Sequence, residues 1–330
     1  MAEQFIIGDF ELNTLDDVTY CLSTLEQRFI QRRDKRAIFA TAYLAITEAM
    51  KNGVASERFG DTPWVAIYVR SFARIYVNAL RAYEAGDMDN VPRAWRVAFD
   101  LCAADDGLVI QHLILGINAH VNHDLPFALI EVGIDPDRPG RYDDHTNVNV
   151  VLGATLDTLQ DHVEKLYSPV LRLFDNLLGK WDDEMSFSMV KNARENAWHV
   201  CLELLEAQNA EEYKVAEQKV NRVSGELAEM IARPLQNVSS LFSSLRSLEG
   251  RSPISLLMKR AKPDIYAFAE GDVLPSLDIL HERLHTIVEK FDLAGSEMAV
   301  YPAFYGLWLH VFSSAVHEGM FGDNDWIIRL

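Results

Sequence analysis

The sequence predicts an all-α protein organised as a multi-helix bundle. Along most of its 330 residues, apolar side chains return at every third or fourth position, which is the period of a helix with one buried face. Capping residues and glycines separate these runs, and no segment alternates apolar and polar residues convincingly, as a half-buried strand would. Hydrophobic residues make up 49% of the chain, which is enough for a substantial core.

The first two helices are delimited by short local signals. Thr14 is expected to cap a helix whose first turn contains Asp16 and Asp17, because acidic side chains suit a helix N-terminus. A second helix is expected over residues 36–52, and Gly53 is expected to end it.

The third helix has a proline at its start and a glycine after its end. Thr62 is the predicted cap, Pro63 the first helical residue, and Gly86 follows the last turn. A fourth helix is predicted over residues 92–103 and a fifth over residues 106–122.

Residues 124–146 are predicted to form a long irregular loop, because three prolines and two glycines interrupt them. Such a loop in a compact domain is often functional. Long helices are then expected over residues 148–178, 183–209 and 211–243, the last of them bent or broken at Pro234.

A change in the sequence pattern near residue 250 predicts that the chain consists of two parts. A helical domain over residues 1–250 carries the polar cluster described below, and residues 251–330 form a helical extension packed on it.

The composition limits which binding partners and which cellular compartment we expect. The formal net charge is −18 and no basic patch is evident, so we do not expect binding to nucleic acid. Three cysteines are too few, and too odd a number, for a disulfide scaffold. With neither a signal-like N-terminus nor an apolar stretch of about 18 residues, we expect a cytoplasmic protein without a membrane span. The oligomeric state stays open, a homo-oligomer included.

The most informative stretch is residues 116–126, where two histidines, two asparagines and an aspartate follow an apolar helix. His120 and Asp124 are one turn apart and share a face, and His112 lies two turns before His120. These three residues are the predicted ligands of a divalent metal, namely zinc, manganese or iron. In the alternative reading, Asp124 caps the turn and His120 bonds to a backbone carbonyl.

Several segments carry a family resemblance. In chain order they are Phe39–Leu44, Trp95–Phe99, Gln111–Leu125, Asn147 or Asn149 with Val151–Leu152, and Phe187–Met189 with Ala193–Trp198. Together they resemble a largely bacterial family known only as a domain of unknown function, over residues 15–245. The shared pattern is Gly-x-Asn-Ala-His-x-Asn-x-Asp-Leu at residues 116–125. The resemblance implies an all-α fold and a common site around His120 and Asp124, but no activity.

The His120-x-x-x-Asp124 spacing is also similar to the metal-binding helix of zinc-dependent phospholipases C and single-strand nucleases. That similarity implies zinc ligands at both positions. Those enzymes normally have a further histidine six residues after the aspartate, where this chain has Ile130. His199 and Glu203 could match their second metal-binding motif.

Further polar residues complete the predicted site. Asp144 and His145, on the predicted loop, are candidate general acids or bases. Arg194 is a candidate to neutralise an anionic substrate group or to anchor Asp124. Three residues are candidates for substrate binding: Asn118, Asn122 and Trp198.

Two more motifs have a structural and a functional reading. Asp182, Asp183 and Glu184 open a predicted helix, where acids suit the helix dipole, or they supply oxygen ligands to magnesium. His281 to His285 match the HExxH pattern of zinc proteases. Because no third ligand follows at the usual spacing, we interpret this segment as a solvated helix face.

Three functions fit these observations. The first is a metal-dependent hydrolase of a small or lipid-like phosphoester, in which the metal activates a water molecule. The second is a metal-free helical protein with an apolar pocket lined by Trp64, Trp95, Trp198 and a final aromatic helix over residues 302–318. There the polar cluster would orient a polar group of the ligand. The third is a structural or partner-binding protein, in which the cluster is a satisfied buried network.

Overall fold

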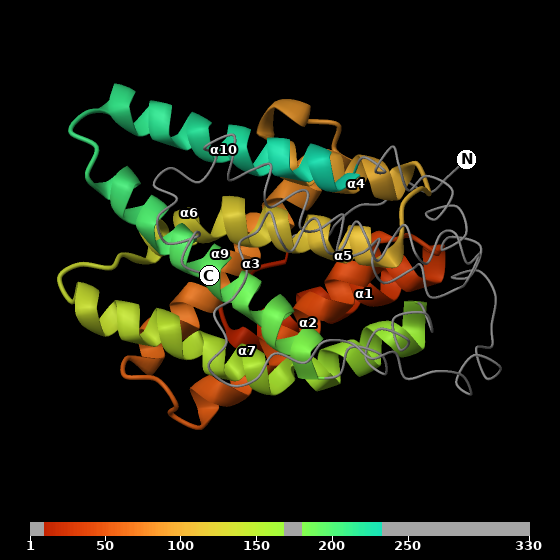
Figure 1. The fold of residues 1–330 in the computed structure, drawn as a ribbon, viewed down its shortest axis with the longest axis horizontal. Helices are drawn as coiled ribbons and strands as arrows, with labels where there is room; N and C mark the ends of the chain where they lie inside the picture. The colour runs from red at the N-terminus through yellow and green to blue at the C-terminus, as the bar shows by residue number, and fades with distance from the viewer. Residues whose placement is uncertain (1–9, 168–179, 233–330) are drawn as a thin grey trace. The chain divides into compact units, whose positions relative to one another are not determined.

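The computed structural model describes residues 10–167 and 180–232, and every regular element in those ranges is helical (Figure 1). In chain order the elements are α1 (Leu15–Arg32), α2 (Arg36–Ala55), α3 (Thr62–Glu84), η1 (Met88–Asn90), α4 (Arg93–Ala103), α5 (Val109–Asn118), η2 (Ala119–Asp124), α6 (Leu125–Val132), α7 (Arg138–Tyr167), α9 (Lys180–Leu205) and α10 (Ala210–Ala232). The predicted all-α bundle is confirmed. The predicted boundary near residue 250 and the extension 251–330, with its HExxH segment and aromatic helix, lie outside the described residues.

Side-chain caps start α1 and α3. The Thr14 hydroxyl accepts from the Asp17 backbone N–H at 3.1 Å, and the Asp17 carboxylate accepts from the Thr14 N–H at 2.8 Å, so this cap is confirmed as a reciprocal pair. The cap of α3 is Asp61 instead of Thr62, because the Asp61 carboxylate accepts from the Trp64 N–H at 2.9 Å. Helix α2 continues past Gly53 to Ala55.

The predicted irregular loop over residues 124–146 is wrong. The chain stays helical through η2 and α6, turns over residues 133–137 and enters α7 at Arg138, ten residues before the predicted start. Pro139 stands in the first turn of α7, where a missing backbone N–H breaks no intrahelical hydrogen bond, whereas Pro126 follows directly after the turn η2 inside the continuous helical run. The break is made by Gly133, whose φ of +74° lies in the left-handed region that favours glycine.

The consecutive segments α5, η2 and α6 form one helical run at the centre of the described bundle (Figure 1). Helices α2, α4 and α10 pack against α5, helices α3 and α9 pack against α6, and η2 touches α3, α4, α9 and α10. Outside this set, α1 packs on α2, and α7 packs on α2 and α9. The polar stretch singled out from the sequence therefore lies on the innermost element.

Close approach of α5 to α2 depends on Gly116. A Cβ atom at this position would lie 2.3 Å from Cδ2 of Phe39, which is far inside van der Waals contact. The absence of a side chain therefore lets the Phe39 ring lie directly against the α5 backbone.

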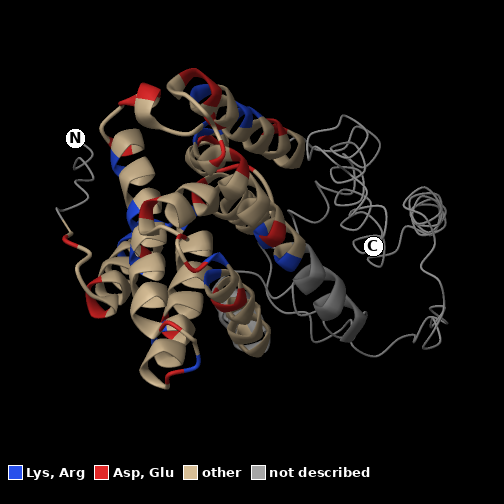
Figure 2. Cartoon of the chain, turned by 90° about the vertical axis from the view of Figure 1, so that its left-hand side faces the viewer, with Lys and Arg blue, Asp and Glu red and all other residues tan. Residues whose placement is uncertain are grey.

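Acidic and basic residues are interspersed along the outer helices, as the red and blue segments of Figure 2 show. Several form exposed ion pairs, such as Lys219 with Glu203 at 3.0 Å, which contribute little to stability. In the described ranges, no helix combines the length and the apolarity that crossing a bilayer requires.

Candidate functional site

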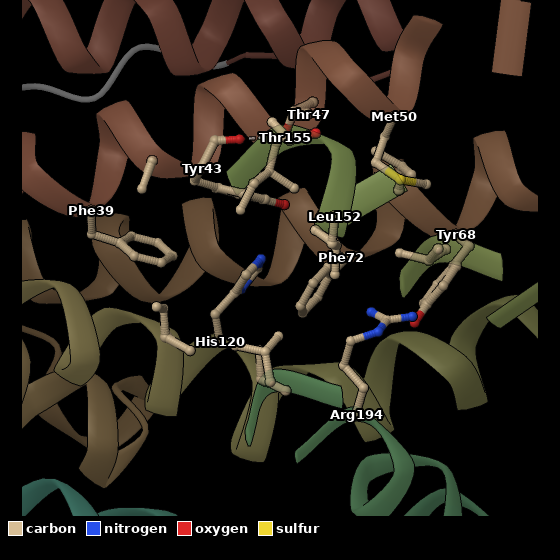
Figure 3. Close-up of a pocket in the computed structure, with 17 residues that line it drawn as sticks. Phe39, Tyr43, Thr47, Met50, Tyr68, Phe72, His120, Leu152, Thr155 and Arg194 are labelled. Carbon is tan, nitrogen blue, oxygen red and sulfur yellow. Dashed lines mark hydrogen bonds between the residues drawn. The ribbon is translucent and has the colours of Figure 1, made fainter. Parts of the chain in front are cut away.

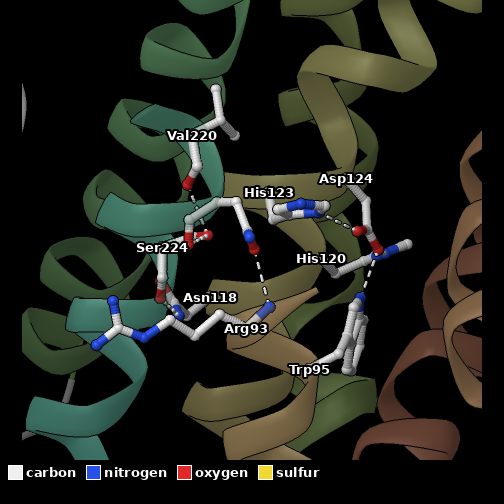
Figure 4. A network of polar contacts seen from close by, with 9 residues as sticks. Arg93, Trp95, Asn118, His120, His123, Asp124, Val220 and Ser224 are labelled. Carbon is white, nitrogen blue, oxygen red and sulfur yellow. Dashed lines mark hydrogen bonds and ion pairs between the residues drawn. The ribbon is translucent and has the colours of Figure 1, made fainter. Parts of the chain in front are cut away.

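The polar cluster is built on a π-helical turn. Over η2 the helix widens, and the Leu125 N–H donates to the carbonyl of His120, five residues back. Pro126 follows at once, and its ring would crowd a carbonyl of the preceding turn in a regular α-helix. The widened turn brings His120, His123 and Asp124 together on one side of the run (Figure 4).

Asp124 is the centre of this cluster, and its side chain is completely buried. One carboxylate oxygen accepts from Trp95 Nε1 at 2.8 Å and from His120 Nδ1 at 3.2 Å. The other oxygen accepts from His123 Nδ1 at 2.8 Å. Burial on its own would raise the pKa of Asp124, but hydrogen bonds from the two histidines outweigh burial and lower it. The carboxylate is therefore ionised and shared by three donors.

His120 is held as one defined neutral tautomer. Burial lowers the pKa of its imidazole, against the opposing effect of Asp124. Since an ionised carboxylate can only accept, Nδ1 carries the proton and donates it to Asp124, which leaves a lone pair on Nε2. Nε2 is buried and has no hydrogen-bond partner in the described part of the chain.

Aromatic rings fix the plane of the His120 imidazole. The Phe72 ring stacks on it with a centroid distance of 3.5 Å and an interplanar angle of 7°. The Tyr43 ring meets it edge-on at 4.3 Å. These contacts hold the Nε2 lone pair in a fixed direction.

That lone pair faces an internal cavity of about 150 Å³ (Figure 3). The cavity lies between α2, α3, α5 with η2, α7 and α9, and its walls are mainly apolar. The lining side chains are Phe39, Ala42, Tyr43, Ile46, Thr47, Met50, Tyr68, Val69, Phe72, Ile117, His120, Val121, Val148, Leu152, Thr155, Val190 and Arg194.

Tyr43 supplies a second unpaired polar atom. Its hydroxyl is buried and has no partner in the described part, and burial raises its pKa well above the usual value. The hydroxyl therefore stays protonated and can donate. By contrast, Thr47 and Thr155 donate to carbonyls of their own helices, at 2.8 Å and 2.7 Å. Of these four side chains, Tyr43 and His120 therefore keep a buried polar atom without a partner among the described residues.

Arg194 also lines the cavity, where it is held by neutral acceptors. Its Nε donates to Oδ1 of Asn149 at 2.8 Å, and one Nη donates to the backbone carbonyl of His145 at 2.7 Å. Burial and the Arg194 charge hold the pKa of His145 well below its usual value, so this imidazole is neutral. Its Nε2 donates to the Arg194 carbonyl at 3.1 Å, which leaves Nδ1 to accept from Tyr68 at 3.1 Å.

The structure places the predicted acid or base residues on α7, not on a loop. The buried Asp144 carboxylate accepts from the backbone N–H groups of Gly60 at 2.6 Å and Asp61 at 2.8 Å, and so ties α7 to the turn before α3. His145 lies behind Tyr68 in the network just described. Arg194 does not anchor Asp124, since its hydrogen bonds go to Asn149 and His145.

The residues predicted to bind a substrate make other contacts and do not line this cavity. Asn118 donates to the backbone carbonyl of Ser224 at 2.9 Å and accepts from Asn122 at 3.0 Å, which joins the central run to α10 (Figure 4). Trp198 packs against the rings of Tyr142 and His145. The lining of the cavity includes none of Asn118, Asn122 and Trp198.

The tryptophans expected to line an apolar pocket do not line this cavity, and the final helix of that prediction lies outside the described residues. Trp95 donates to Asp124, and Trp64 donates to the Gly133 carbonyl at 2.8 Å. Neither ring reaches the lining of the cavity.

A metal at His112, His120 and Asp124 has no structural support. Within the ranges the structure describes, no three histidine, cysteine, aspartate or glutamate side chains gather so that they could hold an ion. His112 Nδ1 lies 3.3 Å from the thiol of Cys102 on α4, and both Asp124 oxygens already accept hydrogen bonds. The metal stays a prediction.

His199 and Glu203, which could match the second metal-binding motif of the zinc-dependent phospholipases C, do not pair with each other. His199 lies 3.2 Å from Glu195, whereas Glu203 binds Lys219. The side chains of Asp182, Asp183 and Glu184 lie outside the described residues.

Sequence reasoning missed Tyr43, Tyr68 and Phe72 as site residues. Their signal was the i,i+4 spacing of aromatics on two helices, Phe39 with Tyr43 and Tyr68 with Phe72. That pattern is equally typical of a core, so it did not distinguish a cavity wall from ordinary packing.

Comparison with known proteins identifies the family alone. No curated protein and no solved structure has detectable similarity to the chain. The sequence profile of a family of unknown function (DUF5995) matches residues 15–234, which is more than half of the chain and close to the span of the resemblance. The similarity to zinc-dependent phospholipases C and nucleases finds no match. The chain therefore belongs to the DUF5995 family, whose function is unknown.

Proposed function

We propose that this protein binds a small apolar molecule carrying a hydroxyl group, inside the cavity beside His120. The observation that supports this is the buried Nε2 lone pair, which has no partner among the described residues. Leaving a buried acceptor unpaired costs about 1–3 kcal/mol. A hydroxyl that donates to Nε2 would remove that cost when the ligand binds.

Tyr43 would complete the recognition of the hydroxyl. Its free O–H can donate to the ligand oxygen while the ligand donates to His120. A group that donates and accepts at once therefore suits this corner of the cavity. An amine salt would suit it less, because the apolar walls described above do not solvate a cation.

The size of the cavity limits the ligand. An engineered protein cavity of roughly 150 Å³ takes up benzene, so a volume of about 150 Å³ suits one six-membered ring with small substituents. Phenol is the simplest molecule that meets the shape and the hydrogen-bonding requirements together.

The metal-dependent hydrolase predicted from the sequence is not the function we propose. Asp124 and His120 bind each other, and the described side chains provide no third ligand beside them.

The direct test is calorimetric titration of the full chain with phenol and with toluene, which have similar size. We expect phenol to bind about tenfold more tightly, since one well-placed hydrogen bond to an otherwise unpaired group contributes about that much. Equal affinity for the two compounds would contradict the proposal.

A matched pair of variants assigns the preference to Nε2. His120→Phe and His123→Phe each remove one hydrogen-bond donor from Asp124, but only His120 lines the cavity. The phenol preference should disappear in His120→Phe and persist in His123→Phe. Its survival in His120→Phe would show that another group receives the hydroxyl.

A further inference from the structure

The cavity contains a buried cation without an acid beside it. Arg194 is 4% exposed and lines the same cavity as His120. In the described ranges, no carboxylate lies within 4.0 Å of its guanidinium. A guanidinium stays charged at any physiological pH, and a buried charge without a counter-ion is unfavourable.

The groups that hold Arg194 are neutral and use only some of its hydrogens. Asn149 and the carbonyl of His145 each accept one hydrogen bond, and the Nη that donates to this carbonyl lies 3.4 Å from Nδ1 of the His145 imidazole, which burial and the Arg194 charge keep neutral. A guanidinium has five N–H donors, so donors remain for a further partner.

Three acids near the cavity, Asp124, Asp144 and Glu195, are engaged elsewhere. Asp144 accepts from two backbone N–H groups before α3, and Asp124 from three side chains on α4 and η2. Glu195, next to Arg194 in sequence, accepts from Tyr142 at 2.9 Å and lies 3.2 Å from His199. No described acid is placed to neutralise Arg194.

We infer that the molecule bound in this cavity is a small hydroxylated carboxylate, with its acid group at Arg194 and its hydroxyl group at His120. The inference rests on the proposed function, because it uses the same cavity, and it adds a second polar end to the ligand. A carboxylate accepts the remaining guanidinium hydrogens and neutralises the charge, while the ring lies among the apolar side chains between the two ends. A ring that carries a hydroxyl and a carboxylate has both polar ends, and Figure 3 shows His120 and Arg194 among the side chains that line the cavity.

The test compares charged and neutral probes of one shape. The full chain is titrated with 3- and 4-hydroxybenzoate and with the corresponding hydroxybenzamides, in which an amide replaces the carboxylate. We expect at least one hydroxybenzoate to bind about tenfold or more tightly than its amide, because hydrogen bonds to charged groups are the stronger ones. Equal affinities, or tighter binding of the amides, would overturn the inference.

Two variants locate the effect. Arg194→Met keeps the apolar stem and removes the charge, and it should abolish the preference for the carboxylate. Arg141→Met is the control, since Arg141 lies on α7 and pairs with Asp61 outside the cavity lining. A preference that persists in Arg194→Met would overturn the inference. If that variant fails to fold, the comparison of acid and amide in the parent protein still decides.

The outcomes separate the inference from the proposed function. If phenol and the hydroxybenzamides bind but the hydroxybenzoates bind no more tightly than their amides, the proposed function stands and the inference fails. If none of these probes binds, both fail.

Discussion

At the residue scale, Asp124 determines what His120 can do. The carboxylate takes the Nδ1 proton, so the nitrogen that faces the cavity is always the acceptor. His123 and Trp95 supply two more hydrogen bonds, which keep Asp124 ionised despite complete burial. The pair therefore presents one acceptor of fixed direction to whatever enters the cavity.

The unpaired hydroxyl of Tyr43 leads to a stability prediction. Because this O–H has no partner in the described part of the chain, Tyr43→Phe should leave the free energy of unfolding unchanged or raise it by about 1 kcal/mol. Tyr68→Phe is the control, because Tyr68 donates to His145 and its loss should cost about 1 kcal/mol. Urea unfolding of both variants measures the difference. A larger decrease in the free energy of unfolding for Tyr43→Phe than for Tyr68→Phe would show that the Tyr43 hydroxyl has a hydrogen-bond partner.

Sequence alone identified the stretch of residues but not their contacts. The polar residues that follow the apolar helix were predicted as a metal or substrate site, and in the structure His120 and Asp124 belong to a buried network. On a regular α-helix, His123 would point away from the face of His120. The π-helical turn changes that angle, and His123 becomes a partner of Asp124.

At the scale of elements, the widened turn is what makes the network. It joins α5 and α6 without a break, so the cluster lies inside the bundle instead of at a helix end. Pro126 is the sequence feature that indicates the widened turn, because a proline inside a helical run requires a local distortion. The same proline can also start a loop, and the sequence by itself does not decide between the two.

The contact between α5 and α2 gives a prediction at this scale. Gly116→Ala should lower the free energy of unfolding by about 1–3 kcal/mol, because the new methyl group would overlap the Phe39 ring. Gly53→Ala, also inside a helix, is the control. Its Cβ would lie 3.2 Å from Phe59, so its effect should stay within about 1 kcal/mol. A Gly116→Ala protein as stable as the parent would contradict the close packing of α5 on α2.

At the scale of the whole molecule, the described bundle encloses several neutral histidines. Burial lowers the pKa of His112 from 6.5 to about 4, and lowers those of His120 and His145 as well. Periodicity predicted the all-α bundle that contains them. Their protonation depends on which side chains surround them, which no local pattern in the sequence specifies.

These histidines predict how stability depends on pH. Below pH 6.5 the histidines of the unfolded chain become protonated, whereas the buried histidines of the folded protein stay neutral. The free energy of unfolding therefore falls as the pH falls. His112 alone should cost about 1 kcal/mol between pH 6.5 and 5.5, and His120 and His145 add to this loss. Asp124 stays ionised throughout this window, because its pKa is lowered below 3.8. Guanidinium unfolding at these two pH values measures the change, and His120→Phe should make it smaller. An unchanged free energy of unfolding would contradict the neutral state of the histidines.

The nitrogen-15 NMR spectrum of the His120 imidazole, with and without phenol, tests directly whether Nε2 is the acceptor for a hydroxyl in the cavity. We predict a protonated Nδ1 and an unprotonated Nε2 in the free protein, and a shift of the Nε2 resonance when the phenol hydroxyl donates to it. His199, which is exposed and outside the cavity lining, should not respond. A proton on Nε2 in the free protein, or an Nε2 resonance that does not respond to phenol, would contradict the account.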